Sequence, residues 1–132
     1  MVVIEVETRK REEVVDITER IREAVRGKSG IAVVYSTHTT TGLIINEAEA
    51  GLMEDIIAHL SNLVPYRAGY RHDMIDSNAD AHIKASLLGN SVIIPVEDGR
   101  LLLGTWQRIL FVELDGPRRR KVHVIVYEAE KG

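Results

Sequence analysis

The last third of the chain contains only strand patterns, and this feature restricts the fold more than any other. From Ser91 onward, residues 92–96 form an apolar run, an Asp-Gly turn signal follows, and residues 101–114 are long enough for one strand that bends at Gly104. Valines then alternate with other residues over 122–126. Consecutive strands joined by short turns pair with antiparallel neighbours, so the sequence predicts a C-terminal antiparallel meander.

Helical patterns occur in three segments of the first two thirds. Asp16 and Glu19 have the capping-box spacing at the start of the first helix, which a glycine ends. The second helix is expected over residues 51–63 and the third over 78–88, with Asn78 as N-cap. Apolar residues lie at core spacing along the second helix, at Leu52, Met53, Ile56, Ile57, Leu60 and Leu63.

Strand patterns also precede and separate the first two helices. Residues 2–7 and 13–15 look like a hairpin, and the wholly apolar run 31–35 is typical of a buried strand. Residues 43–45 form the next apolar segment. The order is hairpin, helix, two strands, two helices and meander. It predicts a single α+β domain over residues 1–132, in which the sheet and about three helices pack as two layers.

Charge and the lack of cysteine exclude several classes of function. The net charge is −3, which gives no support for nucleic-acid binding. Without cysteine there is no thiolate nucleophile and no disulfide, so histidine and carboxylate are the remaining metal ligands. A reducing cytoplasm fits this composition. No secretory signal and no apolar run of about 20 residues occurs, so we expect a soluble, cytoplasmic protein with no membrane partner.

Three of the five histidines stand at polar junctions between elements. His38 follows a buried strand, His72 lies in a loop, and His82 lies one turn inside a helix. Three imidazoles from separate elements can hold a catalytic zinc ion, which needs three protein ligands and an open fourth position. Asp73 is a candidate carboxylate for orienting one of the rings. Spacing alone leaves unrelated surface or capping roles open.

Three other polar blocks are candidates for the same site. Glu47 follows an apolar strand and is either a helix cap or a general acid/base. Trp106 and Gln107 are each the only residue of their type, in a strand pattern where a tryptophan is more typical of a core or interface than of a ligand platform. Residues 118–121 form a basic cluster, which is either a solvated turn or a contact for an anion.

Five short blocks occur in order along the whole chain. They are His38-Thr39-Thr40-Thr41-Gly42-Leu43 with Asn46-Glu47, Tyr70-x-His72-Asp73, Asn78-Ala79-Asp80-Ala81-His82-Ile83-Lys84, Gly104-Thr105-Trp106-Gln107 and Asp115-Gly116-Pro117-Arg118. Together they resemble the YjbQ-like family, whose members are often called secondary thiamine-phosphate synthases. Ser77 stands where the family commonly has Asp, which puts the role of that position in doubt here.

The resemblance implies a homotrimer with a mixed or antiparallel, curved sheet and a polar cleft where His38, His72 and His82 hold a divalent metal. It also implies a reaction that joins a pyrimidine diphosphate to a thiazole phosphate, giving thiamine phosphate and pyrophosphate, with the physiological reaction left open. Zinc suits three histidines, whereas Mg²⁺ suits a diphosphate. The other expected site residues are Glu47, Asp73 and Gln107 for catalysis, and Thr39, Thr40, Arg71, Asn78, Lys84 and Arg118 for binding a small phosphorylated or anionic substrate.

Two other functions use the same residues. A metal-bound hydroxide would make the protein a hydrolase of a small phosphate or acyl substrate. A trimer that binds a metal or a small anion without turnover needs the histidines but has no use for a base such as Glu47.

Overall fold

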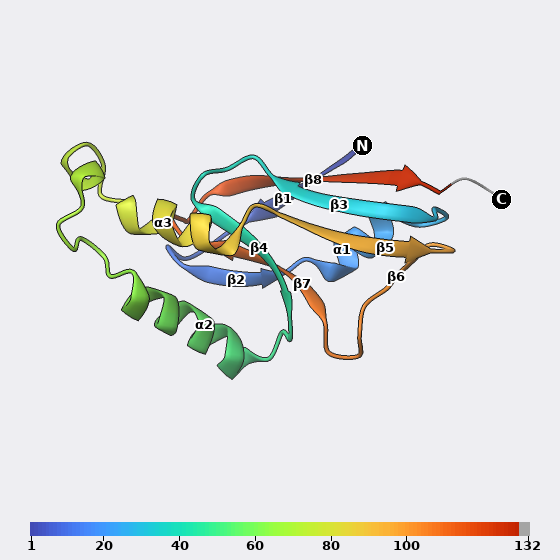
Figure 1. The fold of residues 1–132 in the computed structure, drawn as a ribbon, viewed down its shortest axis with the longest axis horizontal. Coiled ribbons are helices and arrows are strands. Elements are labelled where there is room, and N and C mark those ends of the chain that lie inside the picture. The colour runs from blue at the N-terminus through green and yellow to red at the C-terminus, as the bar shows by residue number, and fades with distance from the viewer. Residues whose placement is uncertain (130–132) are drawn as a thin grey trace.

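The computed structural model describes residues 1–129, which form two antiparallel sheets and three α-helices (Figure 1). The larger sheet has the strand order β1-β8-β3-β5-β6 and the smaller one β2-β7-β4. The strand bounds are β1 Val2–Glu7, β2 Glu13–Asp16, β3 Gly30–Ser36, β4 Thr41–Asn46, β5 Ser91–Glu97, β6 Arg100–Leu101, β7 Arg108–Glu113 and β8 Arg119–Glu128. The predicted α+β class is confirmed, with curled antiparallel sheets and a C-terminal run of strands.

One hydrophobic core joins the two sheets and the first helix, α1 (Thr18–Ala24). The strand period of two sends alternate side chains of β3 and β8 inward, and Val34 and Val124 are registered partners in this core. Phe111 of β7 and Ile21 of α1 reach the same core and are fully buried. Asp16 precedes α1 as predicted, and its carboxylate accepts a hydrogen bond from the Thr18 amide at 3.0 Å.

The second helix, α2 (Ala50–Leu63), does not belong to the core. None of its residues is buried, and Figure 1 shows it extending along one side of the molecule, away from the larger sheet. Its main packing partner is β2, and Leu63 is 70% exposed. The prediction that its apolar stripe packs in the core holds only in part, because Ile57 packs against the second apolar cluster, formed by Ala81, Val112 and Leu114, while no residue of the stripe is fully buried. Periodicity reports that one face is apolar, but it does not report what covers that face.

The first two strands do not form the predicted hairpin. β1 pairs with β8 in the larger sheet, whereas β2 pairs with β7 in the smaller sheet. Residues 8–12 therefore carry the chain from one sheet to the other.

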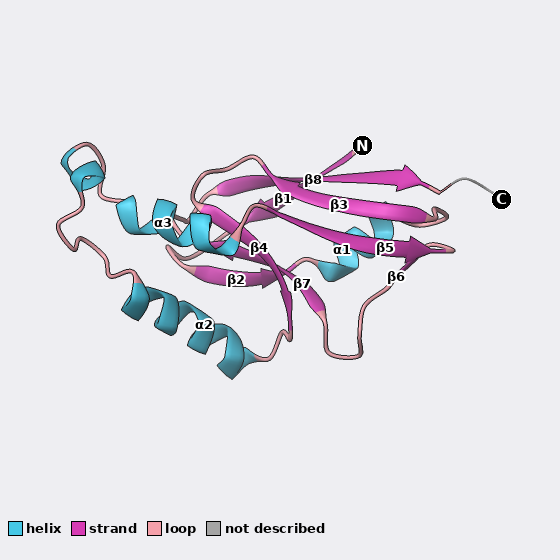
Figure 2. Ribbon diagram, viewed as in Figure 1, coloured by secondary structure: helices cyan, strands magenta, loops and turns pink. Residues whose placement is uncertain are grey.

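A second crossing interrupts the single long strand predicted over 101–114. β6 ends at Leu101 and β7 begins at Arg108, with a loop between them that Figure 2 shows protruding from the sheets. The Gly104 amide donates to Oε1 of Gln107 at 2.8 Å, and the Gln107 amide donates to the Gly104 carbonyl at 3.1 Å. These two bonds close a tight turn, so Trp106 stands on a loop, 71% exposed, and not in a strand.

The third helix, α3 (Ala79–Leu88), lies against β4 of the smaller sheet. The side chain of Leu88 occupies the space beside Gly42, where an added Cβ would lie 2.7 Å from Cβ and Cδ1 of Leu88. Ala81 is fully buried against Val112. This close packing fixes the start of α3, and with it His82, beside the loop that follows β3. None of the helices in residues 1–129 is both long and apolar enough to cross a membrane.

Candidate active site

Two hollows meet at His38 and His82, between the loop after β3 and the first turns of α3. We call one the charged hollow: it has a volume of about 320 Å³ and is lined by Arg118, Arg120 and Asp115 together with hydroxyl and amide side chains. The other, the neutral hollow, has a volume of about 460 Å³ and is lined without Lys, Arg, Asp or Glu, by Thr41, Ala85, Ser86, Gly89 and Asn90. His38, Thr39 and His82 line both.

The loop that carries His38 is held by hydroxyl groups. Ser36 and Thr41 share a buried hydrogen bond of 2.7 Å across its base, and Ser36 Oγ accepts from the His38 amide at 3.3 Å. Thr40 Oγ1 accepts from Arg120 Nη2 at 2.9 Å. The run of hydroxyl residues in the sequence therefore shapes the loop, and Thr39 and Thr40 lie at the cleft as predicted.

His38 has a fixed hydrogen-bond role. Its Nε2 accepts from the backbone amide of Lys121 at 2.9 Å. Because an amide N–H can only donate, a neutral His38 must carry its proton on Nδ1. Burial, followed by the positive charge of Arg120, lowers the pKa of His38 below its ordinary value. His38 is therefore a neutral ring that can donate from Nδ1.

A buried ion pair forms the floor of the charged hollow. Arg120 Nε donates to Glu113 Oε1 at 2.8 Å, and Arg120 Nη2 bonds the other carboxylate oxygen. Glu113 is fully buried and also accepts from the Thr8 hydroxyl at 2.8 Å. Burial alone would raise the pKa of Glu113, but the hydrogen bonds from Arg120 and Thr8 outweigh it and lower the pKa.

The other two histidines are in contact. The rings of His72 and His82 meet edge to face, with centroids 4.8 Å apart and planes at 79°. His72 Nε2 lies 3.0 Å from Asn78 Oδ1. Asn78 Nδ2 donates to Asp115 Oδ2 at 2.9 Å, and Arg118 donates to the same oxygen at 3.1 Å. Asn78 precedes α3 as predicted, but its side chain links His72 to Asp115 and does not cap the helix.

Asp73 caps α3 in place of Asn78. Its Oδ1 accepts from the Ala79 amide at 3.1 Å, while Oδ2 is buried without a hydrogen-bond partner among the described residues. Ser77 accepts a hydrogen bond from Arg67 at 2.9 Å and lines neither hollow.

The histidines as placed do not fit a three-ligand metal site. His38 Nε2 is occupied by the Lys121 amide, and its Nδ1 carries the proton, whereas a metal needs a free lone pair. Within residues 1–129, no group of three or more His, Cys, Asp or Glu side chains is arranged to hold a metal ion. His72 and His82 are in direct ring contact, and His38 and His82 line the same two hollows.

Glu47 and Gln107 lie far from the histidines. β4 pairs Thr41 with Glu113 at the histidine end and Asn46 with Arg108 at the other end. Five residue steps along a strand are about 17 Å, so the two predicted catalytic residues flank the opposite end of the smaller sheet. There Glu47, Trp106 and Arg108 line a separate hollow, and α2 is capped by Glu49 instead of Glu47.

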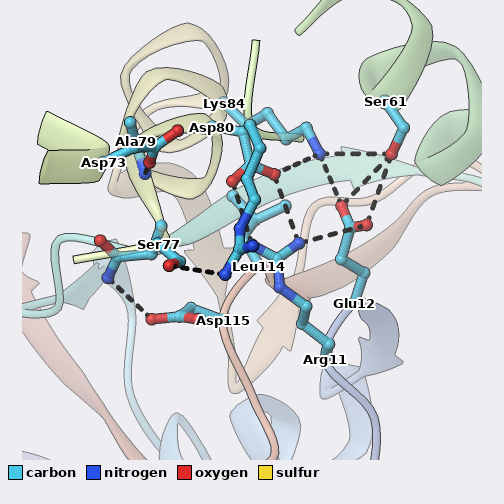
Figure 3. A network of polar contacts seen from close by, with 12 residues as sticks. Arg11, Glu12, Ser61, Asp73, Ser77, Ala79, Asp80, Lys84, Leu114 and Asp115 are labelled. Atoms are coloured by element: carbon cyan, nitrogen blue, oxygen red, sulfur yellow. Dashed lines mark hydrogen bonds and ion pairs between the residues drawn. The ribbon is translucent and has the colours of Figure 1, made fainter. Parts of the chain in front are cut away.

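Two predicted substrate-binding residues also lie elsewhere. Arg71 is exposed on the short 3-10 helix η1 (Arg71–Met74) and lines neither hollow. Lys84 is only 1% exposed, because α3 turns it inward, away from His82. Figure 3 shows its ammonium group between Glu12, Asp80 and Ser61, with Nζ–O distances of 2.8, 3.2 and 3.2 Å. All three N–H donors of the Lys84 ammonium are used in these bonds, so none is left for a substrate anion.

The Lys84 cluster is completed by Arg11, which donates to both carboxylate oxygens of Asp80, at 3.0 and 3.3 Å (Figure 3). Burial alone would raise the pKa of Asp80, but the hydrogen bonds from Arg11 and Lys84 outweigh it and lower the pKa. The cluster links the connection before β2 (residues 8–12) with α2 and α3, so its role is in holding the helices in place.

Sequence reasoning missed the role of Arg120 and Glu113. A usable signal was present, since Arg120 stands two residues before Val122 and Glu113 two residues after Phe111. In a strand this spacing points both side chains to the same face as their buried neighbours, not to solvent.

Comparisons with known proteins agree with this architecture. The sequence profile described as UPF0047 protein YjbQ-like matches residues 2–129. A UPF0047 protein of Archaeoglobus fulgidus is 60% identical over 117 residues, which cover 89% of this chain and 93% of that one. The UPF0047 protein YugU of Bacillus subtilis is 38% identical, covering 92% and 94%.

A solved structure supports the same assignment at the level of the fold. The crystal structure of a hypothetical protein from Aeropyrum pernix K1 is 43% identical to this chain and superposes with a TM-score of 0.93, covering 96% of this chain and 97% of that one. A match of the family profile to nearly every described residue, together with these relatives, places the protein: it belongs to the UPF0047 protein YjbQ-like family.

Proposed function

We propose that the protein is an enzyme that acts on a small phosphorylated substrate in the cleft formed by the charged and neutral hollows. The reaction that we propose is of the thiamine-phosphate-synthase type, in which a pyrimidine diphosphate and a thiazole phosphate give thiamine phosphate and pyrophosphate. The observation that supports it is the division of the cleft, because a charged half and an uncharged half meet at two histidines.

A pyrimidine diphosphate has the same division. Its uncharged ring matches the Thr, Ser and Asn side chains of the neutral hollow, and its diphosphate matches Arg118 and Arg120 in the charged hollow. In this pose the methylene carbon that joins ring and diphosphate lies near His38 and His82. The thiazole phosphate then approaches from the open side of the cleft.

The chemistry needs stabilisation of a leaving group. The carbon–oxygen bond to the diphosphate breaks, pyrophosphate keeps the electron pair, and the thiazole nitrogen forms the new bond to carbon. Arg118 offsets part of the charge that develops on pyrophosphate, and Arg120, whose own charge Glu113 balances, contributes only hydrogen-bond donors. His38 donates a hydrogen bond from Nδ1 to one of the pyrophosphate oxygens. No step requires Glu47, Gln107 or Lys84.

The test is an assay with both substrates that measures thiamine phosphate and pyrophosphate separately. Arg118→Glu reverses a side chain of the cleft that is 55% exposed, so it should raise KM at least tenfold without lowering the melting temperature. Arg119→Glu is the matched control, because Arg119 is also largely exposed, at 68%, but lines neither hollow. Pyrophosphate without thiamine phosphate would indicate a hydrolase, and no turnover of either substrate would contradict the proposal.

A divalent metal on His38, His72 and His82 remains a separate prediction. It requires His38 to give up its hydrogen bond to the Lys121 amide and to present a lone pair. Metal analysis of protein dialysed against zinc checks this. One equivalent in the wild type, and little in His38→Ala, would support the three-histidine site, whereas unchanged binding in His38→Ala would remove His38 from it.

We also propose a homotrimer in the cytoplasm. The register places Val3, Tyr35, Ile93 and Tyr127 on the outer face of the larger sheet, where all four are exposed. An apolar sheet face of this kind is typical of a surface that a neighbouring subunit covers. The number three rests on the family resemblance, and the cytoplasm on the absence of cysteine and on the phosphorylated substrate.

A further inference from the structure

Asn78 links Asp115 to His72, and the carboxylate of Asp115 determines the direction of both hydrogen bonds. Asp115 Oδ2 lies 2.9 Å from Asn78 Nδ2 and 3.1 Å from Arg118 Nη2. An ionised carboxylate can only accept. The amide of Asn78 must therefore turn its NH₂ group to Asp115, since the reverse orientation would bring two acceptor oxygens together.

The orientation of the Asn78 amide then determines which ring nitrogen of His72 carries the proton. With the NH₂ group on Asp115, Oδ1 of Asn78 faces His72 Nε2 at 3.0 Å. An amide oxygen can only accept, so Nε2 must carry a proton. In a neutral ring, Nδ1 of His72 is then the atom with the free lone pair.

We infer that Asp115 and Asn78 are a positioning pair, which acts on His72 and leaves its Nδ1 as the acceptor. Asn78 is 8% exposed and the Asp115 side chain 18% exposed, so solvent has little access to the bond between them, whereas the His72 ring itself is exposed. His82, in edge contact with His72, connects this ring to the cleft.

The two outer histidines of the site are consequently held in opposite tautomers. The Lys121 amide forces the proton of His38 onto Nδ1, whereas Asn78 keeps the proton of His72 on Nε2. One ring offers a donor at Nδ1 and the other an acceptor at Nδ1. In catalysis, which rests on the proposed function, His38 donates from Nδ1 in the cleft, and His72, which lines neither hollow, acts by orienting His82 through their edge contact.

The experiment is long-range proton–nitrogen NMR on the full chain labelled at histidine, above the ordinary imidazole pKa of about 6.5. The wild type should show His72 protonated at Nε2 alone and His38 at Nδ1 alone. Asp115→Asn is nearly isosteric but can donate, which frees the Asn78 amide to reverse and should give His72 a mixture of tautomers. His59 on α2 is the internal control, because it lies outside both hollows.

A double variant tests whether the effect passes through Asn78. Asn78→Ala should also give a tautomer mixture at His72, and adding Asp115→Asn to it should change nothing further. His72 already mixed in the wild type, or unaffected by Asp115→Asn in a protein with native chemical-shift dispersion, would overturn the inference. If the tautomers are as expected but neither substrate is turned over, the positioning pair stands and the proposed function fails. If both hold, Asp115→Asn should lower kcat several-fold, and KM should rise as well because Asp115 also holds Arg118 in the charged hollow.

Discussion

Arg120 is the residue on which the charged hollow depends, because it neutralises a carboxylate that has no access to water. If Arg120 is lost, the charge of Glu113 stays buried with no cation beside it. Removing one member of a buried pair typically costs about 3 to 5 kcal/mol, whereas replacing both by apolar side chains costs far less.

We therefore predict that Arg120→Ala lowers the free energy of unfolding by about 3 to 5 kcal/mol. Urea unfolding measures it. Arg119→Ala is the control, since Arg119 and its partner Glu7 are both largely exposed, and it should change stability by less than about 1 kcal/mol. The double variant Glu113→Leu with Arg120→Met should recover most of the loss. Equal stability of Arg119→Ala and Arg120→Ala would show that the pair is not a buried one.

Acid should destabilise the protein through two carboxylates. The pKa values of Glu113 and Asp80 are lowered in the folded protein from ordinary values of 4.5 and 3.8. A lowered carboxyl pKa adds stability that is present above the unfolded value and is lost as pH falls through the folded value. The urea midpoint should accordingly fall slightly below about pH 6.5, where the lowered pKa of His38 opposes folding, and steeply below pH 4. The Glu113→Leu, Arg120→Met variant should show a smaller fall over that range, and an unchanged slope would exclude Glu113 as a source.

At the residue scale, the sequence indicated which residues lie at the cleft. It did not indicate the Arg120–Glu113 ion pair or the tautomers of the histidines. His38, Thr39, Thr40, Asn78 and Arg118 meet there because each follows or begins a regular element at the same end of the smaller sheet. Glu47 and Gln107 were misplaced because the two ends of β4 look alike in the sequence, each being a polar block beside an apolar run. Only the register of β4 with β7 separates them.

At the element scale, the docking of α3 on β4 sets the position of His82. The contact depends on a glycine, because Leu88 fills the space where any side chain at position 42 would lie. Overpacking such a contact usually costs about 1 to 3 kcal/mol.

Gly42→Ala should lower the melting temperature and shift the NMR signals of His82. Adding Leu88→Ala makes room for the new methyl group, so the double variant should lose less stability than the sum of the two single variants. Differential scanning calorimetry of the three variants measures the coupling. Strict additivity would mean that α3 does not rest on Gly42.

Elements whose position depends on a local pattern were predicted well. Elements whose position depends on long-range strand pairing were predicted poorly. Asp16 before α1 and the start of α3 near Asn78 follow from short-range signals. The false hairpin of β1 with β2, and the false long strand through Gly104, failed because both segments cross between sheets. Such a crossing leaves no trace in apolar periodicity.

At the scale of the whole molecule, the outer face of the larger sheet should hold subunits together. Ile93 is 64% exposed on β5 of this face, so Ile93→Lys should leave the fold intact and dissociate the proposed trimer. Light scattering at micromolar concentration measures the mass, and circular dichroism checks the fold. Glu23→Lys on α1 is the control and should stay trimeric. A wild-type protein with the mass of one chain would refute the homotrimer.

β8 contributes side chains to both faces of the larger sheet and a backbone amide to the site. Arg120 and Val122 point inward, the amide of Lys121 holds His38, and His123 points to the outer face beside Val3 and Tyr35. An insertion of one residue within this strand would exchange the two faces, turning the buried arginine outward and a histidine into the core. An insertion or deletion within β8 would therefore disrupt both faces, whereas the exposed loop before β7 can vary in length. The part of the gene that encodes residues 119–128 can evolve only by substitution.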